Sequence, residues 1–252
     1  MNKLYVIGIG TGNPEHMTIE AIAALNAADV VFALDKGPQK SDLTRLRKEI
    51  CARFSEGEGP RWVEAESPKR DAAGGYKQGV ADWHAAKGEA FAKLIRHELK
   101  DGETGAFLVW GDPSLYDSTL RILPALAADK SLAIEYEVIP GISSLHALAA
   151  AHKMTLNTVG EAVLITTGRK LAQQGFPDCA ETVVVMLDGG TGLNSLAGQD
   201  LEIWWGAYLG SEDEVLRQGK VAEVLDDILA TREKHRAEKG WIMDIYLLRR
   251  LA

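Results

Sequence analysis

Short apolar runs alternate with helical patterns from one end of the sequence to the other. Two of the runs, Ala106–Trp110 and Thr182–Leu187, are apolar almost without a break. Such runs are typical of strands that are buried on both faces of a mainly parallel sheet. The predicted strands are Leu4–Ile9, Val30–Leu34, Arg61–Glu64, Ala106–Trp110, Ile134–Ile139, Ala162–Thr166, Thr182–Leu187, Ile203–Leu209 and Ile242–Leu248.

Helical patterns fill the intervals between these runs. In the stretch 76–99, Trp83, Lys87 and Phe91 recur near the helical spacing of about 3.6 residues. Thr18–Ala28 is rich in alanine, which is a strong helix former. The predicted helices are Thr18–Ala28, 41–53, 76–99, 114–128, 143–152 and 220–238. Because strands and helices alternate, the sequence predicts an α/β fold.

The number of strands favours two sheets over one. A seam is expected after the Gly111-Asp112-Pro113 turn, which predicts an N-terminal α/β domain over 1–115 and a C-terminal α/β domain over 116–252. The late runs Ile203–Leu209 and Ile242–Leu248 are expected to pair as antiparallel strands.

Composition and charge narrow the class of protein. The chain has 252 residues, 46% of them apolar and 25% charged, which excludes intrinsic disorder. Its net charge of −8 is opposite in sign to that of a general nucleic-acid binder. Cys51 and Cys179 lie far apart with no metal-binding spacing around them, so no metal site is expected. No uninterrupted apolar stretch is long enough to span a membrane, and we expect a soluble cytoplasmic protein.

A glycine loop follows the first strand directly, with the sequence Gly8-Ile9-Gly10-Thr11-Gly12-Asn13-Pro14. The dinucleotide fingerprint G-x-G-x-x-G would need glycine at Asn13, so the match is partial. Asp35 closes the second strand, where a ribose-binding carboxylate stands in such folds. The loop has no lysine or arginine to hold a triphosphate. An adenosine-like ligand without phosphate, such as S-adenosylmethionine, fits these features, although a plain strand-to-helix turn also accounts for the glycines.

Further turns follow later strands in the same way. They are Trp110–Tyr116, Pro140–Ser144, Thr166–Arg169 and Val185–Gly189. Asp112 is expected to cap a helix that has Pro113 at its first position. Since α/β folds build their sites at the carboxyl ends of strands, the set predicts a ligand site at that edge.

The order of these turns (GxGxGxP, GDP, PGISS, TTGR and a strand-end methionine) resembles that of the tetrapyrrole (precorrin) methylases. The resemblance covers nearly the whole chain. Longer stretches such as FLVWGDPSLYDSTLRIL and GWIMDIYLLRR look closer to the branch that acts on precorrin-5 in the aerobic route to cobalamin. The resemblance to the family implies two α/β domains with S-adenosylmethionine bound in a cleft between them. It also implies that two copies of the chain form a homodimer. The implied reaction methylates C-1 of precorrin-5, releases acetate and leaves S-adenosylhomocysteine.

The resemblance also assigns site residues by position. The implied cofactor contacts are Gly10, Thr11, Gly12, Trp110, Gly111, Asp112, Leu115, Ser143, Ser144, Met186, Ala207, Tyr208, Leu209 and Gly210. Asp35 matches an acidic residue with an acid/base role in one family member. Release of acetate needs a water and a proton acceptor, for which the candidates are Asp35, Asp112, Asp117, Tyr116, His84 and His146. From these, Asp35 and Tyr116 are taken as the catalytic candidates.

A precorrin carries acetate and propionate arms, so an acidic protein must collect positive charge locally. The segment 36–48 is rich in lysine and arginine. The residues expected to bind substrate carboxylates are Lys36, Arg45, Arg47, Arg121 and Arg169. Alternatively, the charges of segment 36–48 lie on a solvated helix face and serve solubility rather than substrate binding.

Three other functions stay open at this point. A sister precorrin or uroporphyrinogen methyltransferase would share most of these turns. An NAD-dependent oxidoreductase would use the glycine loop and Asp35, but it leaves the other turns unexplained. A tetrapyrrole-binding protein without turnover is the third alternative.

Overall fold

The computed structural model describes residues 1–35, 41–68 and 76–250, and the chain forms two compact units. Unit 1 comprises Met1–Gly10 and Pro14–Ile142, and unit 2 comprises Thr11–Asn13 and Ser143–Ala252. The sequence placed the division at 115/116. The compact units instead part at Ile142, because the fifth strand completes the sheet of unit 1.

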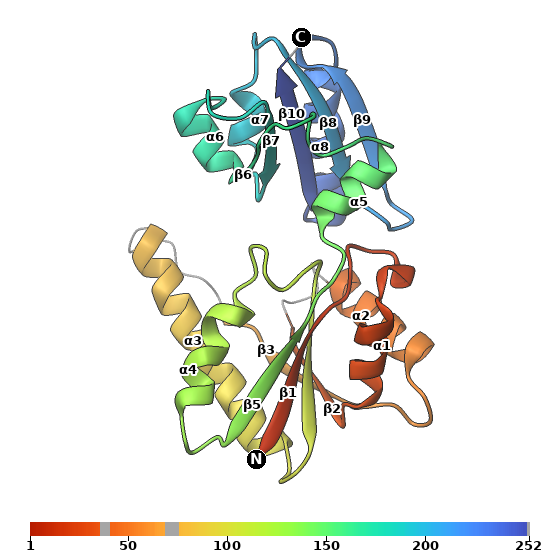
Figure 1. Ribbon diagram of the computed structural model, residues 1–252, viewed down its shortest axis with the longest axis vertical. Coiled ribbons are helices and arrows are strands. Elements are labelled where there is room, and N and C mark those ends of the chain that lie inside the picture. The colour runs from red at the N-terminus through yellow and green to blue at the C-terminus, as the bar shows by residue number, and fades with distance from the viewer. Residues whose placement is uncertain (36–40, 69–75, 251–252) are drawn as a thin grey trace. The chain divides into compact units, whose positions relative to one another are not determined.

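Unit 1 is a parallel five-stranded sheet in the order β3-β2-β4-β1-β5. Its strands are β1 (Asn2–Gly8), β2 (Val30–Asp35), β3 (Arg61–Glu66), β4 (Thr104–Val109) and β5 (Ile134–Ile139). Its helices are the short η1 (Pro14–His16), α1 (Ile19–Asn26), α2 (Ser41–Phe54), α3 (Tyr76–Glu98) and α4 (Thr119–Ala128). Helices α1 and α2 cover one face and α3 and α4 the other (Figure 1), so central strands such as β4 are buried along almost their whole length.

Each face of that sheet carries its own core. Phe91 of α3 and Leu123 of α4 pack with Phe107 of β4 on one side. Leu25 of α1 and Ile50 of α2 pack on the other side. Because the strands are parallel, their carboxyl ends and the turns that follow them share one edge of the sheet.

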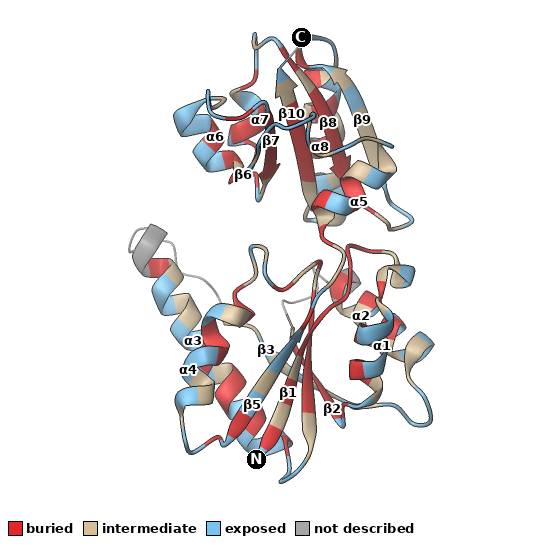
Figure 2. Ribbon diagram, viewed as in Figure 1, coloured by how far each residue is buried: buried red, intermediate tan, exposed pale blue. Residues whose placement is uncertain are grey.

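Unit 2 is a mixed five-stranded sheet in the order β6-β7-β10-β8-β9. Its strands are β6 (Val163–Thr167), β7 (Thr182–Met186), β8 (Leu201–Ala207), β9 (Val215–Lys220) and β10 (Asp244–Arg250). Its helices are α5 (Ser144–Ala151), α6 (Gly168–Gln174), α7 (Thr191–Asn194) and α8 (Val221–Lys239). The most deeply buried side chains lie on the central strands (Figure 2), where Trp205 and Tyr246 are fully covered.

The α/β prediction is confirmed, and each predicted strand is present within a few residues of its expected bounds. The antiparallel pairing of the two late strands is also confirmed, since β8 and β10 run in opposite directions. Strand β9 and helices α6 and α7 were not predicted. The helix expected at 114–128 begins only at Thr119.

Candidate functional site

Glycines let three turns of unit 1 approach one another at the carboxyl edge of its sheet. Gly10 and Gly111 form a main-chain bridge in which the Gly111 N–H donates to the Gly10 carbonyl at 2.7 Å. Both residues have positive φ, +76° and +70°. A Cβ atom on Gly8 would lie 2.6 Å from the main chain of Gly141, which no side chain tolerates. The loops after β1, β4 and β5 are therefore in direct main-chain contact.

Asp112 ties two of these loops together. Its Oδ1 accepts a hydrogen bond from the Ser114 N–H at 2.8 Å, and its Oδ2 accepts one from the Gly141 N–H at 2.9 Å. The expected role of Asp112 as a helix cap is wrong, because its carboxylate closes a local Asx turn and α4 starts later. The N-cap residue of α4 is Ser118, and the preceding Asp117 accepts a hydrogen bond through its Oδ1 from the Thr119 N–H at 2.6 Å.

The residues between these two aspartates form a loop that contains Leu115 and Tyr116. Tyr116 has φ +53° and its side chain is 43% exposed. Partial burial raises the pKa of its phenol, so the group keeps its proton at neutral pH. Asp35 is the last residue of β2, and its side chain lies outside what the structure describes.

In unit 2, Gly12 meets the turn that follows β8. A Cβ on Gly12 would lie 2.8 Å from the Leu209 carbonyl oxygen, and its φ is +148°. Thr11 is buried beside it. Within unit 2, Gly12 therefore lies against the turn Ala207–Gly210, which the sequence assigned to the cofactor separately.

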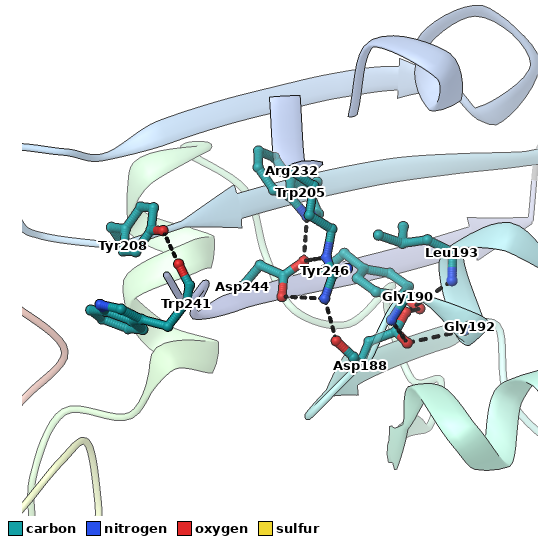
Figure 3. Close-up of polar contacts among 10 residues, drawn as sticks. All are labelled: Asp188, Gly190, Gly192, Leu193, Trp205, Tyr208, Arg232, Trp241, Asp244 and Tyr246. Carbon is teal, nitrogen blue, oxygen red and sulfur yellow. Dashed lines mark hydrogen bonds and ion pairs between the residues drawn. The ribbon is translucent and has the colours of Figure 1, made fainter. Parts of the chain in front are cut away.

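Tyr208 is held firmly within that turn. Its main-chain N–H donates to the Met243 carbonyl at 2.9 Å, and its hydroxyl donates to the Trp241 carbonyl at 2.7 Å (Figure 3). Its ring meets the Trp241 ring edge-on, with centroids 5.2 Å apart. Tyr208 has φ +52°, a conformation that costs energy in a residue with a side chain.

A buried carboxylate fixes the turn after Met186, the last residue of β7. Asp188 is 7% exposed, and the hydroxyl of Tyr246 donates to it at 2.8 Å (Figure 3). Burial and the neighbouring carboxylate raise the pKa of Tyr246, so it stays a donor. Three main-chain N–H groups also donate to this carboxylate, those of Gly190, Gly192 and Leu193.

Arg232 of α8 connects that turn to β10. One of its nitrogens donates to the main-chain oxygen of Asp188, and its Nε forms an ion pair with Asp244 at 2.8 Å (Figure 3). Trp205 Nε1 also donates to Asp244 at 3.0 Å. Sequence reasoning missed this network. The one available signal was a charged residue, Asp244, inside the apolar stretch 242–248.

Ser143 and Ser144 begin helix α5 as predicted. Ser143 is the N-cap residue and is buried, with its Oγ 2.9 Å from His146 Nδ1. Thr167 is the N-cap residue of α6, and unlike Ser143 its side chain accepts a capping hydrogen bond, from the Lys170 N–H.

The predicted substrate-binding cations differ in their surroundings. Arg45, Arg121 and Arg169 have exposed side chains, and Lys36 lies outside the described residues. Arg47 is partly buried. Its Nε donates to the Leu108 carbonyl at 3.0 Å and its Nη1 to the Leu43 carbonyl at 3.0 Å.

Over the described ranges, no cluster of three or more histidine, cysteine, aspartate or glutamate side chains has a geometry that holds a metal ion. Within the same ranges, no helix has the length and apolar character needed to cross a bilayer.

Comparison with known proteins decides the family. The family model described as Tetrapyrrole (Corrin/Porphyrin) Methylases matches residues 3–225. The chain belongs to this family. It is 51% identical over 251 residues to a precorrin-6A synthase [deacetylating] from Sinorhizobium sp, an alignment that covers 99% of this chain and 96% of that protein. A precorrin-2 C(20)-methyltransferase from the same source is 33% identical over 58% of this chain.

Solved structures of other methylases share this fold. A cobalamin synthesis related protein (CobF) from Corynebacterium diphtheriae is 42% identical, with full coverage of both chains and a TM-score of 0.83. A uroporphyrin-III C-methyltransferase from Thermus thermophilus, solved in complex with S-adenosylhomocysteine, has a TM-score of 0.58. Its identity of 18% over 98% of this chain and 97% of that one shows the fold alone.

Proposed function

We propose that this methylase is an S-adenosylmethionine-dependent C-methyltransferase of cobalamin biosynthesis, acting on precorrin-5. It would methylate C-1 of the macrocycle and release the C-20 unit as acetate, with the uptake of water, to give precorrin-6A. The observation that carries this is the 51% identity to a precorrin-6A synthase [deacetylating] over 99% of the chain. A sister methyltransferase is less well supported, because the precorrin-2 enzyme aligns with only 58% of the chain.

The turns described above fit a nucleoside cofactor without phosphate. The segments Gly8–Pro14, Trp110–Leu115 and Ala207–Gly210 contain no lysine or arginine that would hold a phosphate. Bound there, S-adenosylmethionine supplies a methyl group on a sulfonium for in-line displacement. The residues proposed to hold it are Gly10, Thr11, Gly12, Trp110, Gly111, Asp112, Leu115, Ser143, Ser144, Met186, Ala207, Tyr208, Leu209 and Gly210.

The protein's own contribution to methyl transfer would be positioning, which can lower such a barrier by roughly 7–11 kcal/mol. The bonds of Asp112 to Ser114 and Gly141 fix the loops for that purpose. Release of acetate additionally needs proton transfer. Tyr116 is proposed as a proton donor, consistent with the raised pKa of its phenol, and Asp35 as the acceptor.

Calorimetric titration with S-adenosylhomocysteine, with NAD as the parallel titrant, tests the cofactor assignment. We expect saturable binding of S-adenosylhomocysteine and none of NAD. Asp112→Asn weakens the acceptor in the Gly141 contact and should reduce that affinity, whereas Asp178→Asn on the surface of unit 2 should not. Binding of NAD alone would contradict the methyltransferase assignment and indicate that the glycine loop is the dinucleotide site of an oxidoreductase.

We further propose that the protein is a cytoplasmic homodimer. Light scattering of the purified protein should give twice the chain mass of 27.3 kDa. A mass equal to that of one chain at micromolar concentration would contradict the proposed homodimer.

A further inference from the structure

Unit 1 contains a small cavity at the carboxyl ends of β2 and β4, with residues of α2 and α3 also in its lining. Its volume is about 70 Å³. One ordered water needs about 10–15 Å³, so the cavity has room for a group of several heavy atoms. The residues that line it are Phe32, Ala33, Leu34, Leu43, Thr44, Arg47, Lys87, Phe91, Phe107, Leu108, Val109, Asp117 and Thr119.

One side of the cavity is apolar. Phe32, Phe91 and Phe107 are each at most 5% exposed. The Phe107 ring contacts the other two, with its centroid 5.5 Å from that of Phe32 and 4.3 Å from that of Phe91. Such a wall suits a methyl or methylene group. It offers nothing to a ligand that is polar on all sides, such as sulfate or phosphate.

The other side carries charge with a net excess of one positive unit. Arg47 and Lys87 are the cations, and Asp117 is the one carboxylate among the described lining residues. Burial lowers the pKa of both cations and Asp117 opposes that effect, which indicates that the three groups share a poorly solvated space. A single monoanion would balance the charge.

Both cations are held in place and keep donors for a ligand. Lys87 Nζ donates to Ser118 Oγ at 2.6 Å, which uses one of its three hydrogens. Arg47 is fixed through Nε and Nη1 by the carbonyls of Leu108 and Leu43. Its Nη2 edge takes part in neither bond. A guanidinium beside an ammonium is a suitable pair for a carboxylate, which binds arginine through two oxygens.

We propose that this cavity is a subsite for a small aliphatic carboxylate, with Arg47 and Lys87 on its oxygens and the three phenylalanines around its carbon end. The proposal rests on the proposed function in one respect, the source of the carboxylate. That source is either an acetate arm of the tetrapyrrole or the acetate that the reaction releases.

Saturation-transfer NMR with sodium acetate alone tests the subsite, with sodium chloride at equal ionic strength as the salt control. Acetate should bind the wild type and lose about tenfold in affinity in Lys87→Met, since one charge-assisted bond is removed. Lys87→Arg should restore binding. Lys93→Met, on the same helix with an exposed side chain, is the matched control and should bind as the wild type does.

Acetate affinity alone decides whether the subsite exists, and no enzyme turnover is needed. Equal acetate affinity in the wild type and Lys87→Met, or no binding to either, overturns the subsite. If circular dichroism shows that Lys87→Met does not fold, Lys87→Gln takes its place under the same criterion. Because this measurement needs neither S-adenosylmethionine nor a tetrapyrrole, its failure is distinct from a failure of the methyltransferase assignment.

Kinetics with precorrin-5 then distinguish the two sources. If the subsite holds an arm of the substrate, acetate competes with the tetrapyrrole and Lys87→Met raises KM. If it holds the released acetate, inhibition is not relieved by more tetrapyrrole, and Lys87→Met weakens that inhibition while KM stays unchanged.

Discussion

Replacement of Arg232 by methionine should destabilise the protein strongly, because it leaves a carboxylate buried without its cation. The Arg232 and Asp244 side chains are only 9% and 3% exposed, and their Nε and Oδ2 atoms lie 2.8 Å apart. Loss of one partner from a buried ion pair costs about 3–5 kcal/mol. Asp244 would keep the bond from Trp205 Nε1, so we expect a loss near the lower limit, about 3 kcal/mol.

The matched control is another ion pair between α8 and a strand of unit 2, formed by Arg217 and Asp227. Their side chains are 37% and 59% exposed, and exposed pairs contribute about 0–1 kcal/mol. Both Arg232→Met and Arg217→Met remove an arginine of equal size. The difference between them therefore reports burial rather than the loss of a charge.

Urea unfolding followed by circular dichroism measures both effects. Arg232→Met should lower the free energy of unfolding by about 3 kcal/mol, and Arg217→Met by no more than about 1 kcal/mol. A loss below about 1 kcal/mol in Arg232→Met, or equal losses in the two variants, would refute the view that the Asp188 turn depends on this buried pair.

Three further changes test other parts of the structure. Gly141→Ala places a methyl group 2.2 Å from the Gly111 carbonyl oxygen, so it should abolish S-adenosylhomocysteine binding in calorimetry; unchanged affinity would contradict the main-chain contact. Gly88→Ala in α3 meets only a side-chain methyl at 3.5 Å, and it should raise the free energy of unfolding by about 0.5–1 kcal/mol. Burial raises the pKa of the Cys51 thiol to about 11, so at pH 8 the native protein should react with a thiol reagent rapidly at the exposed Cys179 and slowly at Cys51. Equal rates at the two thiols would contradict that burial.

The sequence was most informative where burial dictates the residue type. Central strands such as β4 and β7 are covered on both faces of their sheets, so continuous apolar runs marked them correctly. Strand β9 lies at the edge of its sheet and mixes polar with apolar residues, which makes its sequence VLRQGK similar to that of a loop. Helix α7 has only four residues, too few for a helical period to show.

The candidate site was predictable as a set of turns but not in its polar contacts. Glycine spacing located the loops, because positive φ and close main-chain approach leave little choice of residue. The partner of Asp112 was not predictable, since Gly141 lies far along the chain and contributes only a main-chain N–H. Lys87 fell within the apolar stripe of its helix pattern, and that position was the available sign of a lysine facing the interior.

The most direct test of the proposed reaction is the ratio of acetate to S-adenosylhomocysteine formed from precorrin-5 and S-adenosylmethionine under anaerobic conditions. A deacetylating C-1 methyltransferase yields one acetate for each S-adenosylhomocysteine, together with precorrin-6A. Formation of S-adenosylhomocysteine and a methylated macrocycle without acetate would contradict the account and assign the chain to a sister methylase.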